Sequence, residues 1–278
     1  MSVLAVNNLR KKYDQFELDN VSFALEQGTI TGFIGRNGAG KTTTLKALLN
    51  FVHPDGGEIL FFGKGFKASE FEIKQRIGFV SGGINYYPKK KIKTITATTR
   101  RFYENWDQQA YQLYMKRFEL DENKTPDELS EGMKVKYSLV LALSHHAELL
   151  ILDEPTSGLD PVSRDDLLDI FLGLLQEGIT ILFSTHITSD LDKCADNIIY
   201  IQKGKVLANS DMASFLAQYK VLEFSDEQLT DDLRPKLIGY KQTKHGYRAL
   251  SKATDVSHIN ENGTDADLEA IMIHMEKE

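Results

Sequence analysis

Residues 35–42 read Gly35-Arg36-Asn37-Gly38-Ala39-Gly40-Lys41-Thr42, and this stretch decides the fold of the 278-residue chain. It fits the pattern G-x-x-x-x-G-K-[ST], in which a glycine-rich turn points consecutive backbone N–H groups into one concavity that suits a phosphate group. Lys41 adds a full positive charge, and the hydroxyl of Thr42 can bind Mg²⁺. A helix that begins here directs the positive end of its dipole at the same phosphates. The stretch therefore predicts a nucleoside triphosphate site.

Such a loop needs a buried strand before it and a helix after it. The segment Ile30-Thr31-Gly32-Phe33-Ile34 is a short apolar run that suits a buried parallel strand. From Thr42 to Asn50, leucines at positions 45, 48 and 49 have helical spacing. Both flanking elements are therefore predicted from the sequence.

Composition indicates a soluble globular protein, with 41% hydrophobic and 26% charged residues. No apolar stretch approaches the roughly 20 residues that a membrane-spanning helix needs, and Met1 to Val6 is too short for a signal peptide. We therefore expect a cytoplasmic protein. The single cysteine, Cys194, excludes a disulfide framework and favours a small buried thiol. A net charge of −7 argues against nucleic acid as the main partner, because phosphate backbones favour clustered positive charge.

One local run is basic, Lys89-Lys90-Lys91-Ile92-Lys93. A run of this kind is typical of a solvated surface, and the alternative is contact with lipid headgroups or an acidic partner. The seven histidines are scattered without metal-ligand spacing, so no transition-metal site is predicted.

Periodicity predicts an α/β core, a helical insert and a C-terminal segment. Alternating residues from Phe16 to Leu25 predict an antiparallel strand with one buried face. From about Thr94 to His146 the pattern is mostly helical, and its aromatic residues and leucines, Leu113 among them, have the amphipathic spacing of core packing. Apolar strands that alternate with helices predict a parallel sheet. Strands are expected near residues 58–62, 77–81, 149–152, 179–184, 197–201, 221–224 and 247–250, a hairpin turn at 203–204, and helices at 211–219 and 265–276.

Two acids end the apolar strand Leu149-Leu150-Ile151-Leu152, namely Asp153 and Glu154. The carboxyl end of a parallel strand lies beside the phosphate loop in folds of this kind. Asp153 can therefore hold Mg²⁺ opposite Thr42, and Glu154 can reach a water that faces the γ-phosphate. Alone, this pair is a weak signal, but the loop gives it a role.

The motifs together resemble the ATP-binding cassette (ABC) ATPases. Leu129-Ser130-Glu131-Gly132-Met133, about 20 residues before Asp153, resembles the family's LSGGQ signature. Ser157-Gly158-Leu159-Asp160 resembles its D-loop, and Ser184-Thr185-His186 its switch histidine. Tyr13 stands where the family has an aromatic residue that stacks on adenine. Six motifs in the family order make a chance match negligible.

The resemblance covers roughly residues 2 to 218 and implies the fold class. We expect an α/β P-loop NTPase core with a parallel sheet, an N-terminal antiparallel β subdomain and an inserted helical subdomain at about residues 90–146. The nucleotide-binding domain is predicted to span residues 1–218. Residues 219–278 are predicted to form a small α+β C-terminal accessory module. The cofactors implied are ATP and Mg²⁺.

In the family, ATP joins two subunits, which are identical or different. The resemblance implies that Ser130 and Gly132 bind the γ-phosphate held by the partner subunit, and that Asp160 belongs to the D-loop. Glu154 would polarise the attacking water, and His186 would hold that water and the γ-phosphate in line. The residues expected to bind ATP within one subunit are Tyr13, Arg36, Asn37, Gly38, Ala39, Gly40, Lys41, Thr42 and Thr43, with Thr42 and Asp153 expected to hold Mg²⁺.

The sequence departs from the family pattern at two positions. By alignment, Gly82 stands where the family has a glutamine after an Ile-Gly-Phe strand. Glycine has no side chain to bind Mg²⁺, so water or a neighbouring residue substitutes, or the loop couples differently. In the signature, Glu131 places a carboxylate between Ser130 and Gly132, and this carboxylate must point away from phosphate.

The branch that the chain most resembles is that of the bacterial ABC-2 type exporters, including those for antibiotic or peptide efflux. Residues 101–107 and 266–272 carry this resemblance. It implies a peripheral subunit on the inner face of the cell membrane, bound to integral membrane subunits. In the family a short helix of the membrane subunit meets the cleft beside the insert, near residues 82–88. Tyr86 and Tyr87 are expected either to meet that helix or to pack into the insert.

Two other function classes are open. One is a soluble, non-transport ABC ATPase acting on ribosomes, DNA or cluster assembly, which the acidic charge and the lack of long basic linkers disfavour. The other is a non-hydrolysing regulatory cassette, which the presence of Lys41, Asp153, Glu154 and His186 disfavours. The exported compound is not determined by this sequence, because specificity belongs to the membrane subunit.

Overall fold

The structure is a computed structural model that describes residues 2–82, 87–225, 228, 233–244, 246–256 and 263–277. The chain forms two compact units, Met1–Leu207 and Ala208–Glu278. The boundary predicted from the sequence lies after residue 218. In the structure, helix α8 (Met212–Ala217) packs within the second unit, where the ring of Phe215 meets that of Tyr219 edge-on at a centroid distance of 5.6 Å.

A six-stranded sheet forms the centre of the first unit, in the order β10 (Lys205–Asp211), β9 (Asn197–Gln202), β3 (Ile30–Ile34), β8 (Thr180–Thr185), β7 (Leu149–Asp153) and β6 (Ile77–Ser81). Strands β6, β7, β8, β3 and β9 are parallel to their neighbours. Every residue of β3, β7 and β8 is buried, which is why these strands are continuous apolar runs in the sequence. The predicted parallel core is therefore confirmed.

A second, antiparallel sheet has the order β2 (Glu17–Glu26), β1 (Ser2–Lys12), β4 (Gly56–Phe61) and β5 (Lys64–Gly65). Strand β2 alternates buried and exposed residues, as the sequence pattern predicted. Phe23 of β2 packs against Phe33 of β3, with ring centroids 5.8 Å apart. The two sheets therefore share one hydrophobic core.

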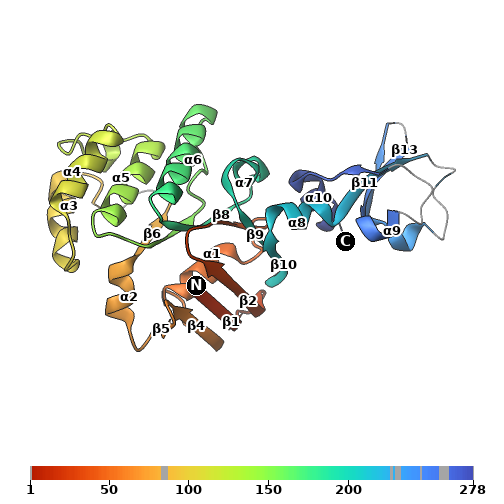
Figure 1. Ribbon diagram of the computed structural model, residues 1–278, viewed down its shortest axis with the longest axis horizontal. Helices are drawn as coiled ribbons and strands as arrows, with labels where there is room; N and C mark the ends of the chain where they lie inside the picture. Colours follow the sequence, from red (N-terminus) through yellow and green to blue (C-terminus); the bar gives the residue numbers. More distant parts are fainter. Residues whose placement is uncertain are drawn as a thin grey trace. The chain divides into compact units, whose positions relative to one another are not determined.

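Helices complete the first unit. Those that accompany the sheets are α1 (Lys41–Leu48), α2 (Glu70–Arg76), α6 (Pro161–Gln176) and α7 (Thr188–Cys194), and those of the insert are α3 (Ile92–Thr99), η1 (Arg100–Phe102), α4 (Gln108–Arg117), η2 (Pro126–Glu128) and α5 (Glu131–Leu143). Figure 1 shows α3, α4 and α5 grouped together, away from strands β1, β2 and β4. In α4 the predicted aromatic stripe is buried at Tyr111, whereas Leu113 is 63% exposed. Residues two positions apart lie on different sides of a helix, so only one of this pair faces the core.

The second unit is a small α+β module, as expected. Its sheet has the order β12 (Ile238–Thr243), β13 (Gly246–Lys252), β11 (Tyr219–Phe224) and β14 (Thr264–Asp265), with antiparallel pairing throughout. Three more elements complete it, η4 (Arg234–Lys236), α9 (Ala253–Val256) and α10 (Leu268–Met275). Leu222, Phe224 and Ala249 belong to its separate core. Within the described ranges, no helix has both the length and the apolar character needed to cross a membrane.

The turn between β9 and β10 closes over the phosphate loop. Lys203 and Gly204 have φ values of 47° and 78°, the left-handed conformation that a tight hairpin turn requires. The N–H of Gly204 donates to the carbonyl of Ala39 at 2.9 Å, and its own carbonyl accepts from the N–H of Asp19 at 2.9 Å. A Cβ at Gly204 would lie 1.8 Å from the carbonyl oxygen of Glu17, so only glycine fits. The turn therefore ties the loop to β2.

Candidate active site

The glycine-rich loop runs from the buried end of β3 to the first residue of α1. Gly40 has φ 115° and ends the loop, while the side chains of Arg36 and Asn37 are exposed. The N–H of Ala39 donates to the carbonyl of Arg36 at 3.0 Å, which tightens the turn. Strand, loop and helix thus follow in the order that phosphate binding at a helix N-terminus requires.

Lys41 is the first residue of α1, and its side chain is 5% exposed. Its ammonium group donates to the carbonyl of Gly35 at 2.6 Å and lies 3.2 Å from Oε1 of Glu154. The loop carbonyl and the carboxylate together offset the cost of burying this charge. The structure therefore brings the predicted lysine and the predicted catalytic glutamate into direct contact.

Asp153 lies at the end of β7, where three strand or helix ends meet. Its Oδ1 accepts hydrogen bonds from Oγ1 of Thr42 at 3.1 Å and from Oγ of Ser184 at 2.7 Å. Asp153 and Ser184 are partners in the parallel register of β7 and β8. Ser184 Oγ also accepts from the N–H of Glu154 at 3.0 Å. Ser184, which the sequence analysis did not single out as a site residue, therefore positions both acids.

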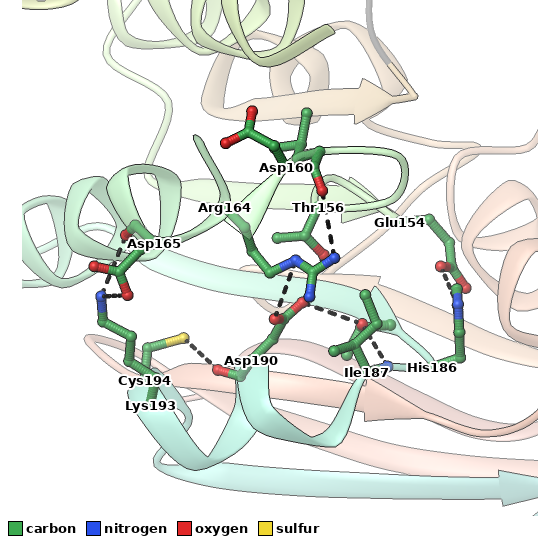
Figure 2. Close-up of polar contacts among 12 residues, drawn as sticks. Glu154, Thr156, Asp160, Arg164, Asp165, His186, Ile187, Asp190, Lys193 and Cys194 are labelled. Carbon is green, nitrogen blue, oxygen red and sulfur yellow. Dashed lines mark hydrogen bonds and ion pairs between the residues drawn. The ribbon is translucent and has the colours of Figure 1, made fainter. Parts of the chain in front are cut away.

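Glu154 and His186 form the most direct side-chain contact of the site. Nδ1 of His186 lies 2.6 Å from Oε2 of Glu154. Figure 2 shows the two side chains pointing toward each other. Because an ionised carboxylate only accepts hydrogen bonds, Nδ1 carries the proton in this contact. Glu154 has φ 51°, a left-handed conformation that is strained for a residue with a side chain and that concentrates at functional sites. Its carboxylate thus spans Lys41 and His186.

Ser130 and Asp160 are helix N-caps. Oγ of Ser130 accepts from the N–H of Met133 at 3.2 Å at the start of α5. Oδ1 of Asp160 accepts from the N–H groups of Val162 and Ser163 at the start of α6, and the hydrogen bonds from Ser163 are the main cause that lowers the pKa of the Asp160 carboxyl. No hydrogen bond or ion pair among the described residues joins these caps to the phosphate loop.

The two unusual family positions have simple local structures. The carboxylate of Glu131 accepts from the ammonium group of Lys134 at 2.6 Å, so its charge is paired within α5. Gly132 is buried, and a Cβ there would meet Ser163 only at 3.6 Å. Gly82 has φ 52°, and nothing lies within 4 Å of the place a Cβ would occupy. A side chain at position 82 therefore has room, although its backbone would be strained.

Two aromatic residues lie before β2. Tyr13, the predicted adenine contact, is 43% exposed, and the ammonium group of Lys11 lies 5.6 Å from its ring centroid. Phe16 is nearer the loop, since its ring would lie 2.9 Å from a Cβ at Gly40. The sequence pattern includes Phe16 only as the first residue of the alternating strand segment and does not predict a place for it at the site.

Asp190, on α7, is a buried carboxylate that the sequence analysis also missed. It is 1% exposed, and its Oδ2 accepts from Oγ1 of Thr156 at 2.6 Å and, at 3.5 Å, from Oγ1 of Thr185. Figure 2 shows the guanidinium group of Arg164 beside Asp190; the distance from Nε to Oδ1 is 3.9 Å, too long for a hydrogen bond. Burial raises the pKa of the Asp190 carboxyl above 3.8. Asp190 therefore connects the residues that follow Glu154 to those beside His186.

The lone cysteine lies behind Asp190. Sγ of Cys194 donates to the Asp190 carbonyl at 3.2 Å, and burial raises the pKa of its thiol to about 12. The thiolate is the reactive form, so this cysteine is chemically inert. The basic run at residues 89–93 is exposed at each of its lysines.

The structure brings five predicted site residues together, namely Lys41, Thr42, Asp153, Glu154 and His186. They surround a glycine-rich loop between a buried parallel strand and a helix. Fold and site together define a P-loop nucleoside triphosphatase.

Comparison with known proteins narrows this class. A family model described as ABC transporter matches residues 18–157. The bacitracin transport ATP-binding protein BcrA of Bacillus licheniformis is 34% identical over 74% of this chain and 69% of that protein. The Nod factor export ATP-binding protein I of Burkholderia orbicola is 35% identical over 75% of this chain and 71% of that protein. The structure of an ATP-binding subunit of an ABC transporter has a TM-score of 0.70 at 26% identity, covering 78% of this chain and 92% of that one.

The chain belongs to the ABC transporter family, as an ATP-binding subunit, and it is an ATPase. A cassette captured as a dimer in a post-hydrolysis state, with ADP and Pi bound, shares the fold, with a TM-score of 0.66 at 21% identity over 75% of this chain and 98% of that one. Nothing in these similarities favours the non-transport alternative. The family resemblance drawn from the motifs is confirmed.

Proposed function

We propose that two such cassettes close around ATP, that hydrolysis reopens them, and that this cycle drives an integral membrane partner. The cassettes would be cytoplasmic, held at the inner face of the cell membrane by that partner. The observation that carries this proposal is the convergence of Lys41, Glu154 and His186 beside the phosphate loop. We propose export as the direction of transport, because two relatives are named for bacitracin transport and Nod factor export.

The exposed position of Ser130 supports a composite site. Ser130 is exposed at the N-terminus of α5, where backbone N–H groups and the helix dipole favour an anion. Its own phosphate loop makes no hydrogen bond to it among the described residues. We therefore propose that Ser130 and Gly132 bind the γ-phosphate of ATP held by a partner cassette. Asp160 would lie near the same contact between the two cassettes. The dimeric relative captured with ADP and Pi has the same fold.

The catalytic roles follow from charge and position. Lys41 would bind phosphate oxygens, Glu154 would accept a hydrogen bond from the attacking water, and His186 would hold that water and the γ-phosphate in line. The contact between His186 and Glu154 orients the carboxylate. Arg36, Asn37, Gly38, Ala39, Gly40 and Thr43 would supply the remaining loop contacts, and Tyr13 would stack on adenine.

The donor set beside Asp153 fits Mg²⁺. Its carboxylate and the Thr42 hydroxyl are hard oxygen ligands that lie 3.1 Å apart. In nucleotide sites Mg²⁺ usually takes one or two protein oxygens, and phosphates and water supply the others. Bound there, Mg²⁺ would neutralise charge on the phosphates. The described part of the chain contains no group of three or more His, Cys, Asp or Glu residues that could hold a metal ion.

A hollow at helix α3 of the insert is a candidate contact site for the membrane partner. It has a volume of about 260 Å³ and is lined by Tyr87 and by residues of α3, among them Ile95 and Thr98. Tyr87 is 63% exposed. Tyr86, for which the same two alternatives were open, lies outside the described residues. An aromatic residue at the rim of a hollow is a typical anchor for a partner helix.

Replacement of this anchor tests the membrane partner. We expect Tyr87→Ala to weaken binding of the membrane subunit roughly thirtyfold, and so to reduce the amount that co-purifies, since an aromatic hot spot contributes about 2 kcal/mol or more. Leu113→Ala is the matched control, because Leu113 is equally exposed at 63% but lies on α4. Equal recovery with both variants would rule out this contact surface, and association of the wild type with ribosomes instead of a membrane protein would refute export.

Position 82 tests whether the loop after β6 still needs its family glutamine. We expect Gly82→Gln to change the ATPase rate, or its stimulation by the membrane partner, because position 82 follows Ser81, the register partner of Asp153. The φ of 52° costs a side chain about 1 kcal/mol, so the fold should survive. Gly82→Ala adds the same strain without the amide. If Gln and Ala behave alike in ATPase assays, the loop has lost the glutamine role.

A further inference from the structure

The second unit contains a hollow that the ATPase function does not use. It has a volume of about 560 Å³, within the range of small-molecule sites. One wall is the β12–β13 hairpin, and the other is α10. Its lining residues are Lys241, Gln242, Thr243, Lys244, Arg248, Ala270, Ile273 and His274.

The hollow depends on a glycine in β12. Gly239 has φ 53°, and a Cβ there would lie 1.9 Å from the carbonyl oxygen of His274. Only glycine therefore allows β12 to approach α10 this closely. The pairing of β12 with β13 shifts register between Ile238 and Lys241, which re-aims the strand beyond the contact. The close approach at Gly239 and the register shift after Ile238 together set the positions of the two walls.

The hollow is positively charged, although the whole chain has a net charge of −7. Lys241, Lys244 and Arg248 line it. Within the described ranges Arg248 forms one ion pair, with Glu223, whose Oε1 lies 3.9 Å from Nε and whose side chain is exposed. No carboxylate forms an ion pair with Lys241 or Lys244 in the part of the chain that is described. Three cations that share at most one distant acid attract an anion.

A buried histidine adds a second, independent feature. His274 is 3% exposed and lines the hollow, and its Nδ1 lies 2.5 Å from the carbonyl oxygen of Gly239. A carbonyl only accepts, so Nδ1 carries the proton, and Nε2 has no hydrogen-bond partner among the described residues. Burial lowers the pKa of His274, and the charges of Arg248, Lys277 and Lys241 lower it further. An anion in the hollow would offset those charges.

Apolar side chains of α10 also line the hollow. Ala270 is buried, and Ile273, which is 43% exposed, continues the same side of the hollow. A ligand that is charged at one end and apolar at the other would cover both surfaces. A purely polar anion would leave the apolar part in water.

We propose that this hollow binds a phosphate group carried by an amphipathic molecule, with the phosphate at Lys241, Lys244 and Arg248 and the apolar part over Ala270 and Ile273. Arginine and lysine are the residues that bind phosphate most often, through charge-assisted hydrogen bonds. The phosphate can belong to a lipid headgroup or to a soluble organic phosphate. This site lies in the second unit, so it is separate from the phosphate loop of the ATPase.

His274 provides the test, because phosphate should raise its pKa. The full chain is labelled with ¹³C at the histidine Cε1 positions, and the His274→Gln variant assigns the resonance among seven histidines. We expect inorganic phosphate to shift the His274 titration to higher pH in the wild type. The double variant Lys241→Gln/Lys244→Gln should bind phosphate roughly tenfold more weakly. Lys252→Gln, an exposed lysine of β13 outside the hollow, should bind like the wild type.

Vesicles distinguish the two sources of the phosphate. If the ligand is a lipid, the full chain should sediment with phosphatidylglycerol vesicles but not with phosphatidylcholine vesicles, and the double variant should lose this binding. If the wild type binds inorganic phosphate but no vesicle, the source is a soluble phosphate. If phosphate leaves the His274 titration unchanged, or if the double variant binds like Lys252→Gln, the proposal is wrong.

Discussion

Glu154→Gln should still bind ATP but should turn it over about 10² to 10⁴ times more slowly, the range that a positioned acid–base group contributes. Glutamine keeps the size of the side chain, and its amide oxygen can still accept from Nδ1 of His186, which now lies 2.6 Å from Oε2. It removes the negative charge that faces the attacking water and that lies 3.2 Å from the Lys41 ammonium group. ATP should therefore stay bound, and the closed dimer should accumulate.

Single-turnover ATPase assays and light scattering with ATP and Mg²⁺ measure these two effects. Glu148→Gln is a suitable control, because Glu148 is an exposed glutamate whose carboxylate pairs with Arg76, away from the loop. If Glu154→Gln hydrolyses ATP at the wild-type rate, another residue activates the water. If turnover stops while the variant remains monomeric with ATP, the assignment of the catalytic carboxylate survives and the ATP-bound dimer is refuted.

Asp190→Asn should lower the ATPase rate while leaving the stability of the fold almost unchanged. Burial raises the pKa of Asp190, so its ionised form costs folding free energy at neutral pH, and asparagine removes that cost. Asparagine can still accept from Oγ1 of Thr156, whereas the charge facing Arg164 is lost. We expect the free energy of unfolding to stay within about 1 kcal/mol. We expect kcat to fall roughly tenfold, because Thr156 and Thr185 lie close in sequence to Glu154 and His186, for which we propose catalytic roles.

The sign of the pH dependence provides a further check. In the folded state the carboxyl of Asp190 holds its proton to a higher pH than its ordinary value of 3.8. Its contribution to stability is therefore greatest below 3.8 and is lost as pH rises through the raised pKa. The asparagine variant should lack this loss, which chemical denaturation at several pH values can measure.

Asp190→Ala is the contrasting variant. It leaves the hydroxyl of Thr156 and the buried Nε of Arg164 without the carboxylate, and we expect it to lose about 3 kcal/mol of stability. A normal kcat in Asp190→Asn would show that Asp190 is only structural. Equal destabilisation by Asn and Ala would show that the charge itself supports the fold.

Local sequence patterns predicted the elements that carry the site. The loop of residues 35–42 is recognisable because its glycines, lysine and threonine each have one physical task at a set spacing. The buried strands β3, β7 and β8 appeared as apolar runs because both of their faces are covered. The stripe predicted to be buried in α4 is only partly buried, since Leu113 is apolar but faces solvent.

Long-range partners were not predictable in the same way. Thr156 and Asp190 are 34 residues apart, and Gly239 and His274 are 35 residues apart. An aspartate on a short helix and a glycine in a strand carry no local sign of such partners. Position 204 is a third example, because only glycine fits beside the carbonyl of Glu17, which belongs to another strand.

By itself, the sequence determined the triphosphate chemistry, the family and the order of strands and helices along the chain. These properties depend on residue types at short, regular spacing. The tertiary structure decided which side chains meet: Ser184 with Asp153, His186 with Glu154, and Asp190 with Thr156. The reason is that these contacts depend on which strands are neighbours and in what register, as β7 and β8 are. Sheet order and register are set by packing across the whole core, and no local segment encodes them.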